Sequence, residues 1–94
     1  MSDKKTELVD LSSFELEQLL GLFIGLLSAK AWQYMGLRIT PGKNEPEKDL
    51  VKASLSIDCL DCIIEHLTKT INSEEADKMR AIVTDLKLNY ARQS

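Results

Sequence analysis

The sequence predicts an all-α fold, and three observations carry that prediction. Apolar residues recur every three or four positions along most of the chain, which is the helical period. Typical helix-start and helix-stop residues bracket three such stretches, and no stretch alternates apolar and polar residues as a strand would. The 94 residues are 44% hydrophobic and 29% charged, a balance typical of one small folded domain. We therefore expect a short N-terminal tail over 1–11 and a single helical domain over 12–94.

The first helix is predicted over about 13–35. Ser12 and Glu15 have the spacing of a capping box, in which each side chain accepts a hydrogen bond from the other residue's backbone N–H. Gly36 favours the left-handed conformation that ends a helix. Leu37 then follows at the position expected for a Schellman motif.

Within this helix, the stretch Leu19–Ala29 carries no charged residue. A surface helix normally keeps one polar face, and this stretch has almost none. Because the rest of the chain supplies only two further helices, we expect part of this apolar surface to remain uncovered within one chain. Burial by a second copy is the leading interpretation, and it completes the core as an oligomeric helical bundle, a homodimer or a higher homo-oligomer. The residues expected to mediate self-association are Leu19, Leu22, Phe23, Ile24, Leu26, Leu27 and Trp32.

Gly21 and Gly25 add the spacing GxxxG to that stretch. Each glycine lowers helix stability by roughly 1 kcal/mol relative to alanine, so we expect close packing to offset that loss. In a soluble protein this packing would lie within a tight bundle, whereas in a bilayer the same spacing would bring two membrane helices together. The bundle is the preferred interpretation.

The second helix is predicted over about 46–70. Asn44 and Glu47 repeat the capping-box spacing, and Pro46 is tolerated in a first helical turn. A seam with alternating spacings of three and four follows, formed by Leu50, Ala53, Ile57, Leu60, Ile64, Leu67 and Ile71. A second flank is also apolar and consists of Val51, Leu55, Cys59 and Ile63. We expect this helix to be buried over more than half of its circumference, with its seam contributing to self-association.

The third helix is predicted over about 73–92. Asn72 or Ser73 caps it, and Glu74 and Glu75 follow at the end where the helix dipole favours negative charge. Only a few residues separate this helix from the second one. The two helices should therefore form an antiparallel hairpin.

The order of these features resembles a family of small bacterial proteins catalogued as domain of unknown function 1844. The resemblance runs from Phe14 to Tyr90 and implies a compact helical protein, without implying a function. The chain departs from the family pattern at Lys69-Thr70-Ile71 and at its two cysteines. The residues that carry the resemblance are Ala31, Gly36-Leu37, Pro41-Gly42, Lys48-Asp49-Leu50, Ile57-Asp58, Leu60, Glu74-Glu75, Asp85-Leu86-Lys87 and Tyr90.

Cys59, Cys62 and His66 form the one grouping with a chemical character. Spacings of three and four place them on one face of the second helix. Two thiolates and an imidazole are zinc ligands, and the two thiols alone would suit redox chemistry. The alternative is that both cysteines are small buried apolar residues and that the histidine lies at the boundary of the core.

Composition and charge narrow the function classes. The net charge of −3 argues against nucleic-acid binding, which relies on clustered basic residues. The first residues are acidic, unlike a signal peptide, and the apolar stretch is shorter than the ~20 apolar residues that span a bilayer. We expect a cytoplasmic, non-enzymatic protein without a cofactor that self-associates as a structural or interaction module, with an unknown protein partner as a further possibility. The alternatives are the cysteine–histidine metal or redox protein and a membrane-associated accessory protein that uses the first helix.

Overall fold

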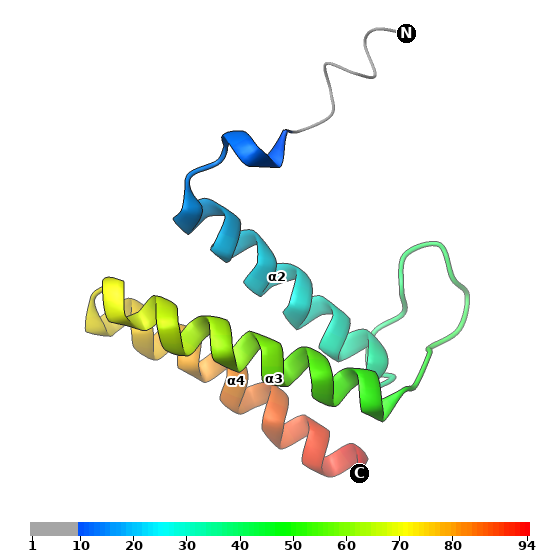
Figure 1. Ribbon diagram of the computed structural model, residues 1–94. Coiled ribbons are helices and arrows are strands. Elements are labelled where there is room, and N and C mark those ends of the chain that lie inside the picture. The colour runs from blue at the N-terminus through cyan, green and yellow to red at the C-terminus, as the bar shows by residue number, and fades with distance from the viewer. Residues whose placement is uncertain (1–9) are drawn as a thin grey trace, which may run out of the picture.

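A computed structural model describes residues 10–94, so the predicted tail over 1–11 lies largely outside the described residues. Within residues 10–94 the fold is all-α, as predicted, and one bridge between Met35 and Lys48 is its only β pairing. The elements in chain order are the 3₁₀ turn η1 (Leu11–Ser13), α2 (Leu16–Tyr34), α3 (Leu50–Leu67), the 3₁₀ turn η2 (Thr68–Thr70) and α4 (Ser73–Gln93). Figure 1 shows α3 and α4 as an antiparallel pair, with α2 packed on α3 and converging with it at the C-terminal end of α2.

The start of the first helix differs from the prediction. Ser12 does not cap α2, because its backbone N–H and its hydroxyl both donate to the Asp10 carboxylate, over 3.1 and 2.6 Å. This pairing closes η1, and the two residues after it, Phe14 and Glu15, are extended. The helix α2 then begins at Leu16, where the Gln18 side chain accepts a hydrogen bond of 2.9 Å from the Glu15 backbone N–H.

The end of α2 follows the prediction. Gly36 has a φ of +81°, in the left-handed region. Its N–H donates to the Gln33 carbonyl over 3.0 Å, and the Leu37 N–H donates to the Trp32 carbonyl over 3.1 Å. These two hydrogen bonds constitute the Schellman motif.

Replacing Gly36 with alanine is expected to lower the free energy of unfolding by about 1 kcal/mol, because a β-carbon is strained at this φ. Space is not the obstacle, since an added Cβ would meet Lys48 at an ordinary 3.5 Å. Urea unfolding followed by circular dichroism measures the change. Gly36→Asn is the matched control, because asparagine tolerates the left-handed region better. Equal stability of the alanine variant and the parent would contradict the assignment.

The second helix begins four residues later than predicted. Lys48 is held in an extended bridge to Met35, and the Asp49 N–H donates to the Tyr34 carbonyl over 2.7 Å. These contacts return the loop to the end of α2 and exclude a helix over the same residues. Asp49, rather than Asn44, is the N-cap of α3, and its carboxylate accepts from the Lys52 N–H over 3.1 Å.

The third helix confirms its predicted start. Asn72 is the N-cap of α4, and its side-chain oxygen accepts from the Glu75 N–H over 2.8 Å. One ion pair fastens α4 to α3, with the Lys87 Nζ 2.9 Å from Oδ2 of Asp61. The hydrogen bond to Asp61 raises the pKa of Lys87 above its ordinary value of 10.5. The ion pair therefore contributes to the stability of the folded state at pH values below 10.5. That contribution is lost as the pH rises through the raised pKa of Lys87.

The core lies along one side of α3. Most of the predicted seam is buried there, namely Ala53, Ile57, Leu60, Ile64 and Leu67. The rest of the chain covers it, through Ile24 and Ala31 of α2, Met35 directly after α2, and Val83 and Leu86 of α4. The seam is therefore filled within one chain.

The second flank of α3 corrects the sequence prediction. Val51 is 80% exposed and Leu55 is 62% exposed, and Cys59 is exposed as well. Ile63 alone is partly buried. The reason is geometric, because α2 and α4 both lie against the seam side of α3 and leave the opposite side open. Less of this helix is buried than its apolar content indicates.

Candidate self-association surface

The solvent-facing side of α2 carries a continuous strip of apolar side chains. Its members recur at spacings of three and four, which places them on one face of a helix. Leu16, Leu22, Phe23 and Leu26 are exposed, and Leu19 between them is half-buried. We call this set the α2 face; its residues are Leu16, Leu19, Leu22, Phe23 and Leu26.

The seven residues predicted to mediate self-association divide between this face and the core. Leu22, Phe23 and Leu26 are exposed on the α2 face, together with the half-buried Leu19. Three others point into the chain's own core: Ile24 is buried, and Leu27 and Trp32 pack partly buried against it. Leu16 belongs to the face but was missing from the predicted set, although it lies one turn before Leu19.

Gly21 and Gly25 lie in the same part of α2, and both are exposed. Beyond its chain neighbours and the nearby backbone of α2, an added β-carbon at either position would meet no atom within 4 Å. The expectation that these glycines are packed tightly inside the bundle is therefore wrong. Their small size leaves the backbone of α2 open to close approach from outside the chain.

Two charged residues bound the α2 face at its ends. Glu15 precedes it as the N-cap of α2, and Lys30 follows it one turn after Leu26. Both are exposed. Lys30 places its Nζ 5.7 Å from the centre of the Tyr34 ring, on the same helix, and Lys52 of α3 approaches that ring to 5.5 Å. Glu17 is not part of this set and lines a hollow of about 230 Å³ that α2 forms with the end of α3 and with η2, and Leu16 at the start of the α2 face reaches the same hollow.

The cysteines and the histidine all lie on α3, as their spacing predicts, but the prediction that the cysteines are buried is wrong. Cys59 and Cys62 are free thiols and both are exposed, so neither is a buried packing residue. His66 is exposed on the same helix and lines the hollow that also contains Glu17. Among residues 10–94, no three histidine, cysteine or carboxylate side chains converge in a way that could hold a metal ion.

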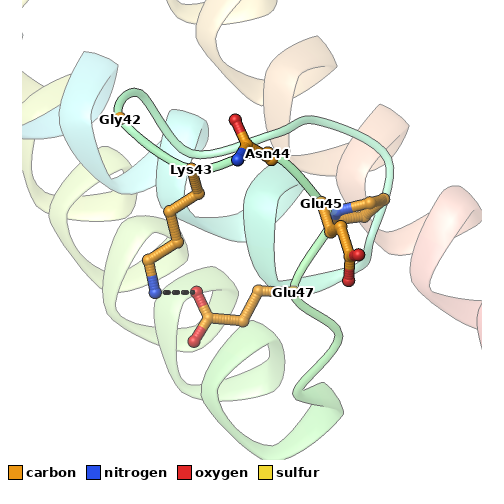
Figure 2. Close-up of a pocket in the computed structure, with 6 residues that line it drawn as sticks. Gly42, Lys43, Asn44, Glu45 and Glu47 are labelled. Atoms are coloured by element: carbon orange, nitrogen blue, oxygen red, sulfur yellow. Dashed lines mark hydrogen bonds and ion pairs between the residues drawn. The ribbon is translucent and has the colours of Figure 1, made fainter.

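A second hollow, of about 510 Å³, lies within the loop between α2 and α3. Six consecutive residues, 42–47, line it, and Figure 2 shows the Lys43 and Glu47 side chains meeting across it. Their Nζ and Oε1 atoms are 3.2 Å apart, and both side chains are about half exposed. The hollow is thus the open inside of one loop, with the Lys43–Glu47 ion pair at its edge.

Comparison with known proteins identifies the family. A family model described as a domain of unknown function (DUF1844) matches residues 18–92, which include most of α2 and all of α3. The chain belongs to the DUF1844 family. The match confirms the resemblance seen in the sequence, and the DUF1844 description assigns no activity. No curated protein and no solved structure matches the chain. In the described part of this DUF1844 protein, no helix combines the length and the apolar character that crossing a membrane requires.

Proposed function

We propose that this DUF1844 protein is a non-enzymatic self-association module that forms a homodimer through the α2 face. The observation that carries the proposal is the exposure of Leu22, Phe23 and Leu26 on a helix with no charged residue between Glu17 and Lys30. Large apolar patches on a folded domain mark interaction surfaces. The cellular role would be that of a structural or interaction module.

The energy available from the α2 face supports a reversible dimer. Covering its exposed side chains is worth roughly 3–6 kcal/mol for each protomer, at 1.5–3 kcal/mol for a fully buried side chain. Two protomers supply roughly twice that amount, which is of the same order as the ~4–15 kcal/mol lost in freedom on association. We therefore expect association that depends on protein concentration.

The remaining parts of the proposal rest on sequence. The two thiols suit the cytoplasm, where cysteines stay reduced. The net charge of −3 does not favour a nucleic acid as the partner. We propose no cofactor and no reaction, and an unknown protein partner is an outcome that the following experiment can reveal.

Replacing Leu26 with glutamate is expected to weaken the dimer at least tenfold, because each interface would then bury two carboxylates. Analytical ultracentrifugation over a range of concentrations measures the dissociation constant. Leu88→Glu is the matched control, because Leu88 of α4 and Leu26 are both 56% exposed. The control should dimerise like the parent protein, and circular dichroism should show both variants folded.

Two results would contradict the proposal. If the parent protein remains monomeric at hundreds of micromolar, it does not form the proposed homodimer. The partner of the α2 face would then be a different protein. Equal weakening by Leu26→Glu and Leu88→Glu would place the contact away from the α2 face.

A further inference from the structure

We infer that the second copy lies antiparallel on α2, with the two-fold axis beside Leu22 and Phe23 and with Glu15 of each copy facing Lys30 of the other. This inference rests on the proposed function and specifies how the α2 face recognises its partner. It follows from the order of apolar and charged residues along that face.

Four of the five apolar residues of the face are symmetric about the point between Leu22 and Phe23. In an antiparallel pair with its axis between Leu22 and Phe23, Leu19 lies opposite Leu26 of the second copy, and Leu22 lies opposite Phe23. A two-fold axis makes each contact occur twice, so a surface can pair with itself only if it is self-complementary in this way. All four side chains are exposed or half-buried in the single chain and are available for these contacts.

The charges select the direction of the pair. With the same axis, Glu15 lies opposite Lys30 of the second copy, and the symmetry repeats this ion pair at the other end. In a parallel pair the two copies of Glu15 would face each other, and so would the two copies of Lys30, which opposes association. Both residues are exposed and they bracket the apolar strip, because Glu15 directly precedes α2 and Lys30 lies about 21 Å along the helix from Leu16.

The other charges of this region do not disturb the arrangement. Glu17 lies in the hollow against His66 and Leu67, on the side of α2 that faces α3. Gly25 adjoins the face, and beyond its chain neighbours and the nearby backbone of α2 no atom lies within 4 Å of where its β-carbon would be. The two helices can therefore approach closely along their uncharged middle turns.

Charge reversal tests the register. Glu15→Lys and Lys30→Glu should each weaken self-association about tenfold, because each variant places like charges at both ends of its own dimer. An equimolar mixture of the two variants should form a heterodimer with the affinity of the parent protein, because opposite charges then meet at both ends. Mass photometry or ultracentrifugation of one labelled variant with the other measures this recovery.

The matched controls are Glu17→Lys and Lys52→Glu. The first reverses the same charge in the first turn of α2, and the second removes the other lysine from the Tyr34 ring, yet neither residue lies on the α2 face. Both controls should dimerise like the parent. If the parent dimerises but the mixed variants do not recover, the antiparallel register is overturned while self-association stands. If the parent is monomeric, the proposed function itself fails.

Discussion

Replacing Leu60 with alanine is expected to lower the free energy of unfolding by about 3 kcal/mol. Leu60 lies in the middle of α3, is fully buried, and belongs to the cluster that joins α2, α3 and α4. Truncation removes its transfer energy and leaves a cavity that three helices cannot all collapse to fill. A small domain has only about 5–15 kcal/mol in total, so the variant should be folded only marginally.

Urea unfolding followed by circular dichroism and by Trp32 fluorescence measures this loss. Leu88→Ala is the control for the same chemical change at an exposed site, and it should shift the free energy of unfolding by less than about 0.5 kcal/mol. Similar losses for the two variants would show that α3 is not the central helix of the core.

Aspartate at two adjacent positions of α2 is expected to give opposite outcomes. Ile24→Asp should unfold the chain, because Ile24 is 6% exposed and the carboxylate would have no partner in an apolar core, a loss of at least about 4 kcal/mol. Phe23→Asp should leave the fold intact and remove the dimer, because Phe23 is 40% exposed on the α2 face.

Circular dichroism reports the fold of each variant, and ultracentrifugation reports its mass. The two readouts separate the roles, since Ile24→Asp should lose its helical signal while Phe23→Asp keeps it as a monomer. A folded Ile24→Asp protein would contradict the placement of α2 in the core. A Phe23→Asp protein that still dimerises would contradict the α2 face.

Local signals in the sequence succeeded where one or two neighbouring residues decide the structure. Gly36 ends α2 and Asn72 begins α4 as predicted, because a left-handed glycine and a capping side chain act through contacts within a few residues. The predictions that helices begin at Ser12 and at Asn44 were wrong, because these residues or their neighbours make other contacts. Asp10 takes the hydrogen-bonding groups of Ser12, and the bridge between Met35 and Lys48 keeps the residues after Asn44 out of a helix.

The sequence by itself determined that the chain is all-α, that the middle of α2 lacks charge, and that its apolar surface is large for three helices. These properties depend on the composition and on the spacing of apolar residues, and both can be taken directly from the sequence. The tertiary structure alone decided that Ile24 faces inward while Phe23 faces outward, and that the flank with Val51 and Leu55 is open. Both sides of α2 and of α3 carry apolar residues, so the spacing of apolar residues does not show which side of each helix is buried. Tertiary contacts decide which side is buried, because α2 and α4 both pack against one side of α3. The opposite sides of α2 and α3 are left to solvent or to a second copy.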